Sequence, residues 1–309
     1  MLRYGLCCIS LQLQERENPV KFQTMTYKRF AGMPRDEALS TLGDRILNNM
    51  EATNAIIEYC HESDFTYRIS SALFPLVTYD KANVELTDLP NHDDIQDAFD
   101  DISNTIARTG VRVSCHPSEY NVLASTNQEA VDKTITELNF YSSFMDRIGC
   151  PANHNSPMNI HVHNKTGTHS EIINRFMCGF NKLDDNCKNR LVIENDDKLK
   201  CWSVKELIHI FNPQTNIPIT FDYLHHKCHP DNLAEEVAVG ACCATWGNVK
   251  PLFHYSESRE GNNPRHHADY AYNNFNTYGL DFDVDFELKM KDNAINAHRQ
   301  EYNMVAQGV

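Results

Sequence analysis

The chain has 309 residues, of which 41% are hydrophobic and 10% aromatic, enough for a sizeable core and too apolar for a disordered protein. Its formal net charge of -14 argues against a nonspecific nucleic-acid coat, yet it permits a site that collects cations. The chain shows no signal peptide, no run of about 18 apolar residues and no repeated spacing among its 11 cysteines. We therefore expect free thiols, no membrane contact and an intracellular, cytoplasmic or nucleoid location.

Short strand-like runs alternate with longer helix-compatible segments along the whole chain. The expected strands are Leu2–Ile9, Thr66–Ser71, Val111–His116, Met158–His163, Arg190–Asn195, Ile217–His226, Lys250–Tyr255 and Phe282–Glu287. Helical spacing of apolar residues occurs between them, in Arg45–Cys60, Asp94–Arg108, Gln128–Ile148 and Leu233–Ala244. This alternation predicts a (β/α)8 TIM barrel that forms a single domain over residues 1–309, with a doubly wound open sheet as the alternative.

The sixth run, Ile217–His226, is typical of a buried strand that delivers metal ligands at its end. It is rich in β-branched and aromatic residues, as strands covered on both faces are. Side chains alternate along a strand, so Thr220 and Asp222 share one face. Long connections at 12–34, 75–93 and 256–264 follow expected strand ends, which is where barrel enzymes place their sites.

Six successive strands, the third to the eighth, end in residue types that bind metals. A single strand-end histidine is weak support, but a series on the functional face is hard to obtain by chance. Imidazole and carboxylate ligands together favour zinc or manganese over magnesium or calcium. The residues concerned are His116, His161, Glu194, Asp222 with His225, His254, and Glu287.

Strand parity adds detail to this candidate site. Glu194 and Glu287 point into the barrel, on the opposite side from their apolar neighbours. Asp283 and Asp285 lie lower on the same face as Glu287, where hydrogen-bonded core positions suit them better than ligation. His163 shares a face with His161, and we expect it to support the ligands and not to bind metal itself.

Several motifs in this sequence resemble those of the UV damage endonuclease family, whose fold is also related to the endonuclease IV type. The matching stretches extend from the second strand to Glu287, which is most of the chain. They are Tyr67–Pro75, Ser114–Tyr120, Leu191–Asp196, Asp222–His226, and the spaced His254 and His267.

The resemblance implies an enzyme that cuts damaged double-stranded DNA immediately 5′ to a pyrimidine photoproduct and leaves a 3′-hydroxyl. It implies up to three divalent ions, usually Mn²⁺ with Zn²⁺ or Mg²⁺ possible, which activate water for phosphodiester hydrolysis. By this analogy Glu194 bridges two ions, and Glu194, Asp222 and Glu287 are the catalytic carboxylates. The first ion is held by His116 and His161, the second by Asp222, His254 and Glu287, and the third by His225 and His267.

The resemblance also assigns residues to the DNA and exposes departures from the family pattern. Glu119 and Tyr120 match a lesion-probing pair, although the first position is usually Gln. Basic side chains that could meet phosphates on the loop face are Arg68, Lys227, Arg259 and Arg265. Further departures are Leu252, where relatives have a lysine, and Leu6 and Ser10, where they have a tyrosine and an asparagine.

Some alternatives stay open at the level of sequence. The spacing from His254 favours His267 over His266 as a ligand, but spacing alone decides that choice. A metal-dependent sugar isomerase or epimerase could use a similar barrel, because fold does not determine function. A catalytically lapsed relative that binds DNA without cutting it is the third reading. No obligate protein partner is evident.

Overall fold

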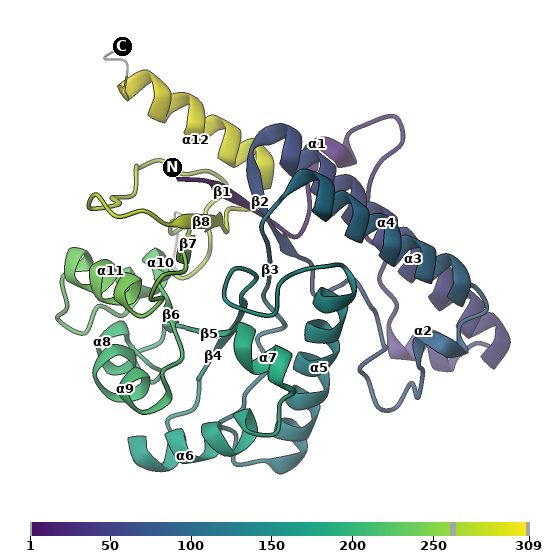
Figure 1. Ribbon diagram of the computed structural model, residues 1–309, viewed down its shortest axis with the longest axis horizontal. Coiled ribbons are helices and arrows are strands. Elements are labelled where there is room, and N and C mark those ends of the chain that lie inside the picture. The colour runs from purple at the N-terminus through teal and green to yellow at the C-terminus, as the bar shows by residue number, and fades with distance from the viewer. Residues whose placement is uncertain (1, 260–263, 307–309) are drawn as a thin grey trace.

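The computed structural model describes residues 2–259 and 264–306 as parallel strands surrounded by helices (Figure 1). The strands are β1 Tyr4–Cys7, β2 Phe65–Ile69, β3 Val113–Cys115, β4 Met158–His161, β5 Leu191–Glu194, β6 Ile219–Thr220, β7 Leu252–Tyr255 and β8 Asp283–Phe286. All of them are buried along their whole length, as strands covered by helices on the outside and by side chains on the inside must be.

The eight strands form one sheet in the order β6-β5-β4-β3-β2-β1-β8-β7. Every ladder is parallel, and β1 lies between β2 and β8. The two ends of this order are joined by a parallel bridge between Asp222 and His254, and the His254 backbone N–H donates to the Phe221 carbonyl at 2.9 Å. The sheet is thus a nearly closed barrel, and the predicted (β/α)8 fold is confirmed.

The helices stand around the strands, with α3 and α4 packed side by side along one flank (Figure 1). The longer helices are α3 Arg35–Ser63, α4 His92–Thr109, α5 Gln128–Arg147, α6 His169–Phe180, α11 Glu235–Ala244 and α12 Lys291–Ala306. The shorter ones are α1 Leu11–Gln14, α2 Tyr27–Ala31, α7 Asp185–Arg190, α8 Val204–Glu206, α9 Asn212–Thr215 and α10 Tyr223–Cys228. A 3-10 turn, η1 Leu86–Asp88, and a π turn, η2 Leu207–Phe211, complete the set for the described residues.

Local sequence signals explain several helix ends. α6 begins with a capping box. The Thr168 side chain accepts the Glu171 backbone N–H, and the Glu171 side chain accepts the Thr168 backbone N–H. α4 ends at Gly110 with φ 66°, a left-handed conformation that glycine adopts without steric cost. α1, α2 and η1 lie inside the connections after β1 and β2, so those long segments are ordered by short helical turns of their own.

The sixth strand is much shorter than the sequence suggested. β6 covers only Ile219–Thr220, and the chain enters α10 at Tyr223. The cause is Asp222, whose carboxylate accepts the His225 backbone N–H at 2.7 Å and caps the helix. The prediction of a strand through His226 was therefore wrong, and His225 stands on the first turn of a helix.

A layer of polar side chains fills the barrel below the strand ends. Asp285 of β8 is fully buried, and its carboxylate lies 3.4 Å from the Ser114 hydroxyl. Its register partner on β1 is Gly5, where an added Cβ would lie 1.9 Å from Asp285 Oδ1. Glycine therefore lets β1 pair with β8 while Asp285 points inward, whereas a larger residue would displace the Asp285 and Thr66 side chains.

Asp283 lies one layer lower and is neutralised by three cations. Arg3, Arg112 and Lys250 approach its carboxylate at 2.8, 3.0 and 2.9 Å. These contacts confirm Asp283 as a paired core residue at the amino-terminal end of the barrel.

All 11 cysteines are free thiols, as their irregular spacing predicted. Among the described residues, none of the helices has both the length and the apolar character that crossing a bilayer requires.

Candidate metal centre

The Glu194 carboxylate lies at the middle of a group of histidines on the carboxyl-terminal face of the barrel. It is 1% exposed at the end of β5. Glu194 Oε2 lies 3.2 Å from His116 Nε2, 3.6 Å from His161 Nε2 and 3.1 Å from His254 Nδ1, while Oε1 lies 3.1 Å from His225 Nδ1. The strand-end residues predicted from the sequence thus converge on one carboxylate.

The other two predicted carboxylates stand beside His254. His254 Nδ1 lies 3.2 Å from Glu287 Oε1, and Glu194, Asp222 and His254 each offer a donor atom within 4.8 Å of the others. His116, His161 and Glu194 form a second group of the same kind. Because metal ligands around one ion lie about 3 Å apart, both groups have the spacing of a ligand set.

His267 joins the site next to Glu287, on the connection that follows β7. Its Nδ1 lies 2.6 Å from the Glu287 carbonyl oxygen and 3.8 Å from Glu287 Oε2. His266 beside it is exposed. This arrangement supports the choice of His267 over His266.

Backbone carbonyls determine which nitrogen most of these histidines can offer. His116 Nδ1 faces the Pro117 carbonyl at 3.0 Å, His225 Nδ1 faces that of Asn195 at 2.9 Å, and His267 Nδ1 faces that of Glu287. An N–H at Nδ1 leaves the lone pair on Nε2, which is the arrangement that metal-binding histidines need.

Three further polar residues hold the ligands from behind and were not identified as such from the sequence. The Asn159 amide donates to Glu194 Oε2. Asn195 binds the Asp222 backbone in both directions, accepting its N–H at 2.8 Å and donating to its carbonyl at 3.1 Å. Arg68, which is 9% exposed, forms an ion pair with Glu287. Strand parity could have suggested Asn159 and Arg68, because both point into the barrel.

Charge is shared between carboxylates and imidazoles throughout the centre. Burial opposes the charged forms, but the His254 charge depresses the pKa of Glu194, and the Arg68 and His254 charges depress that of Glu287. In return Glu194 and Glu287 raise the pKa of His254 to about 9 against the effect of burial. Burial raises the pKa of Asp222. The buried carboxylates therefore require positive charge nearby.

The residues present fit divalent metal ions. Two buried atoms of the predicted ligands beside Glu194 make no hydrogen bond: His254 Nδ1 and Asp222 Oδ2. Buried polar atoms are normally satisfied, so such a concentration is typical of a site completed by a ligand. Mixed nitrogen and oxygen donors suit manganese or zinc, and the buried negative charge would attract either ion.

The residues predicted to probe DNA stand on a braced loop after β3. Tyr120 is 82% exposed, and Glu119 beside it is also exposed. On either side of this pair, Ser118 and Asn121 donate to the Glu137 carboxylate of α5, the latter at 2.9 Å. The loop therefore presents a large aromatic ring to solvent from a fixed backbone.

The predicted phosphate contacts have different surroundings. Arg68 is occupied by Glu287, and Arg265 Nε lies 3.2 Å from Asp197 Oδ2. Lys227 is exposed on α10, and Arg259 is exposed on the connection after β7. Phosphate contact by these residues stays a prediction.

Apart from the exposed Glu119, the positions that depart from the family pattern are buried. Leu6 and Leu252 are at most 2% exposed. Ser10 is 1% exposed, caps α1 through Leu13 N–H, and donates its hydroxyl to Asp292 of α12. Ser10 therefore has a structural role at the start of the first connection.

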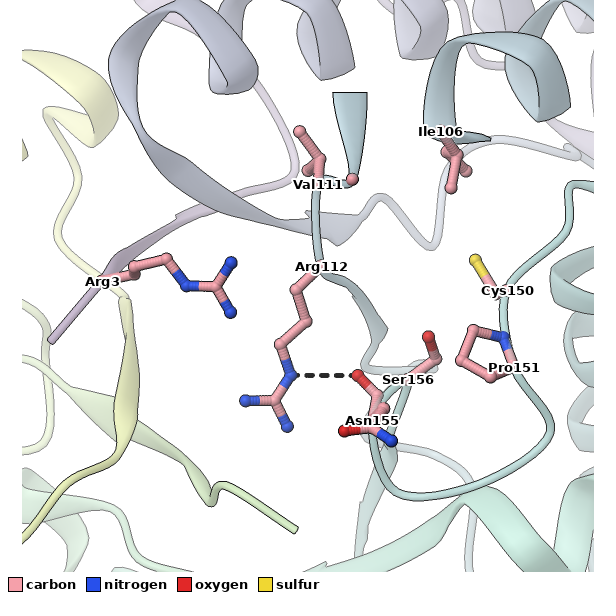
Figure 2. A pocket seen from close by; sticks show the side chains of 9 residues that line it. Arg3, Ile106, Val111, Arg112, Cys150, Pro151, Asn155 and Ser156 are labelled. Carbon is pink, nitrogen blue, oxygen red and sulfur yellow. Dashed lines mark hydrogen bonds between the residues drawn. The ribbon is translucent and has the colours of Figure 1, made fainter. Parts of the chain in front are cut away.

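A pocket of about 310 Å³ lies at the opposite end of the barrel, next to the starts of β1, β3 and β4. Figure 2 shows Arg3 and Arg112 at its edge, with Arg112 Nε donating to the Asn155 carbonyl at 2.9 Å. Because both guanidinium groups are paired with Asp283, this pocket offers no free charge and none of the predicted ligands among its described lining residues.

Comparison with known proteins places this geometry in context. The family model described as "UV-endonuclease UvdE" matches residues 2–307. Proteins named UV DNA damage endonuclease are 28% identical in Bacillus cereus strain B4264, over 96% of this chain and 92% of that one, and in Nostoc sp. strain PCC 7120, over 98% and 91%.

Solved structures agree at the level of the fold. The crystal structure of SacUVDE superposes with a TM-score of 0.80 at 26% identity, covering 98% of this chain and 99% of that one. Endonuclease IV from Thermus thermophilus gives 0.56 at 12% identity, and the 3-keto-D-glucoside 4-epimerase YcjR from E. coli gives 0.58 at 10%, each covering 99% of this chain and 100% of the other. These two share the barrel and carry no conclusion about chemistry.

Proposed function

Because the chain belongs to the UV-endonuclease UvdE family, we propose that it is a metal-dependent repair endonuclease that nicks UV-damaged duplex DNA immediately 5′ to a photoproduct and leaves a 3′-hydroxyl. The observation that carries the proposal is the set of four histidines within 3.1–3.6 Å of Glu194 at the carboxyl-terminal face. Barrel enzymes place catalysis at this face.

The proposed ligands are those that converge in the structure: His116, His161, Glu194, Asp222, His225, His254, His267 and Glu287. Divalent ions bound there, up to three and preferably Mn²⁺, would activate water and neutralise charge on the scissile phosphate. Glu194 Oε2 faces His116, His161 and His254 while Oε1 faces His225, so Glu194 is the residue that could serve more than one ion. Asn159 and Arg68 hold Glu194 and Glu287 in fixed orientations.

Tyr120 supports the assignment of damaged duplex as the substrate. A braced and exposed aromatic ring can insert between bases, and unstacking costs less where a lesion has weakened the duplex. Glu119 carries a charge that phosphates repel, so we propose that it faces the base edges and not the backbone.

Cleavage of a labelled duplex with one cyclobutane dimer tests the proposal, beside an undamaged duplex, with Mn²⁺ and with chelator. We expect Mn²⁺-dependent nicking 5′ to the dimer, which Glu194→Gln abolishes and the surface variant Glu129→Gln retains. Tyr120→Ala should keep its bound metal and lose much of its preference for the damaged strand. Since base stacking on an aromatic ring contributes about 1–3 kcal/mol, that loss should be roughly 5- to 150-fold.

The same assay separates the alternatives. Nicking that ignores the dimer and persists in chelator would refute the proposal. Binding of metal and damaged DNA without cutting would identify a lapsed relative, which the departures at Leu6, Glu119 and Leu252 would then explain. Isomerisation of free sugars in place of nicking would support the epimerase reading, for which the shared barrel is the only argument.

A further inference from the structure

His161 differs from three other histidines of the centre in how its ring is held. His116, His225 and His267 each direct Nδ1 at a backbone carbonyl 2.6–3.0 Å away. His161 is 8% exposed, and its Nδ1 makes no hydrogen bond. The polar group in front of that nitrogen is a carboxylate, Asp196 Oδ1, at 3.5 Å.

From this geometry we infer that Asp196 is the positioning residue for His161: it accepts the Nδ1–H of the ring and so directs Nε2 toward Glu194 and the metal. This inference rests on the proposed function, because it assumes that His161 is a ligand. A carboxylate that receives the distal N–H of a metal-binding histidine sets its tautomer and orientation and increases its basicity.

Asp196 is itself held in place on several sides. It is 2% exposed, it lies two residues beyond Glu194, and its Oδ2 accepts the Trp202 backbone N–H at 3.2 Å. Its own N–H donates to the Trp202 carbonyl at 2.9 Å. These bonds leave the carboxylate little freedom to rotate, as a group that orients another must have.

His163 holds the same carboxylate oxygen. Its Nδ1 lies 2.9 Å from Asp196 Oδ1, and its ring stacks on that of His161 with centroids 4.7 Å apart and planes at 24°. Asp196 thus lies next to Nδ1 of His161, and His163 packs against both the Asp196 carboxylate and the His161 ring.

The test measures the ring and the metal separately, and neither readout requires nicking. In the metal-free chain at about pH 7.5, nitrogen-detected NMR of the histidine rings should show His161 with its proton on Nδ1. Asp196→Ala should give a mixture of tautomers and weaken Mn²⁺ binding about 10- to 100-fold. Mn²⁺ binding should be weakened less in Asp196→Asn, which keeps an acceptor oxygen. It should also be weakened less in His163→Ala, which loses only the contact that holds Asp196 in place.

Asp197→Asn is the matched control, because Asp197 is the adjacent carboxylate and pairs with Arg265 instead of a histidine. It should leave the tautomer and the Mn²⁺ affinity unchanged. An Asp196→Ala protein with wild-type tautomer and affinity would overturn the inference. If that variant does not fold, an Asp196→Asn protein that binds Mn²⁺ as wild type does and keeps an unshifted ring spectrum would overturn it equally. Loss of nicking in the wild type would refute the proposed function and leave these readouts intact.

Discussion

At the scale of single residues, the protonation of His254 makes metal affinity depend on pH. Its pKa is about 9 in the metal-free protein because Glu194 and Glu287 stabilise the protonated ring, against about 6.5 in an unfolded chain. The stabilisation from this charged ring is fully present below about pH 6.5 and is lost as the pH rises through about 9. Metal affinity changes in the opposite direction, since the ligand must release its proton.

We therefore predict that Mn²⁺ affinity rises between about pH 6.5 and 9, by up to about tenfold per pH unit for each proton displaced. Calorimetric titration in two buffers of different ionisation enthalpy would measure both the affinity and the proton release. His163→Gln should keep the dependence, because His163 has a similarly raised pKa but is not one of the proposed ligands. An Mn²⁺ affinity that stays constant over this range would show that metal binding does not displace the proton of His254.

The identity of the proposed ligands could be predicted from single positions, whereas their supports could not. His116, His161, Glu194, His254 and Glu287 lie at the ends of β3, β4, β5, β7 and β8, so residue type and parity suffice to find them. Asp196 and Asn195 follow Glu194 in loop conformation, where parity no longer determines direction. Their partners, Trp202 and Asp222, are set by how the following loops return to the barrel.

At the scale of elements, Asn49 of α3 joins a helix to the connections after two strands. Its amide donates to the carbonyls of Gln23, Ala72 and Leu73 at 3.0–3.2 Å and accepts the Gln23 N–H at 2.6 Å. The residue is fully buried. These bonds tie the segment after β1 and the segment after β2 to the same helix.

Asn49→Ala should lower the free energy of unfolding by about 2–3 kcal/mol, because it leaves buried carbonyls without a donor. The neighbouring Asn48→Ala removes an exposed bond to the Lys21 carbonyl and should cost under about 1 kcal/mol. Urea unfolding with unchanged m-values would measure both. Equal losses in the two variants would contradict the role given to Asn49.

Element types were predictable where periodicity was long and failed where a side chain changed the backbone. The helix expected at Gln128–Ile148 occurs at Gln128–Arg147, because an apolar stripe of that length has one stable partner, the sheet. The apolar run at 217–226 looked uniform, but the Asp222 cap ended the strand and began α10. The pattern of apolar residues does not show where a side chain will end a strand by capping a helix.

At the scale of the whole molecule, the two ends of the chain are parts of one barrel. β1 pairs with β8, and Asp292 of α12 accepts the Ser10 hydroxyl and the Leu11 N–H. We therefore propose that residues 1–309 unfold as a single domain in one cooperative transition.

Metal should raise the midpoint of that transition, because ions bind the folded state. An ion at 100 times its dissociation constant adds about 2.7 kcal/mol, which for a chain of this size is a shift of roughly 5 °C. Calorimetry with Mn²⁺ and with chelator would measure it. The shift should vanish in Glu194→Gln and persist in Glu129→Gln. Two separate transitions, or a midpoint indifferent to chelator in the wild type, would contradict the expectation.

The contact between Gly5 and Asp285 limits the routes by which this barrel can diversify. A methyl group at position 5 would lie 1.9 Å from the Asp285 carboxylate, so alanine there forces the aspartate side chain to move. Once a smaller residue replaces Asp285, the Thr66 hydroxyl, 2.7 Å from that Cβ, is the remaining obstacle, and a side chain placed at position 5 would then block the return of aspartate. The order of substitutions therefore matters at this pair, and a lineage that loses the aspartate first acquires a change that later steps make hard to reverse.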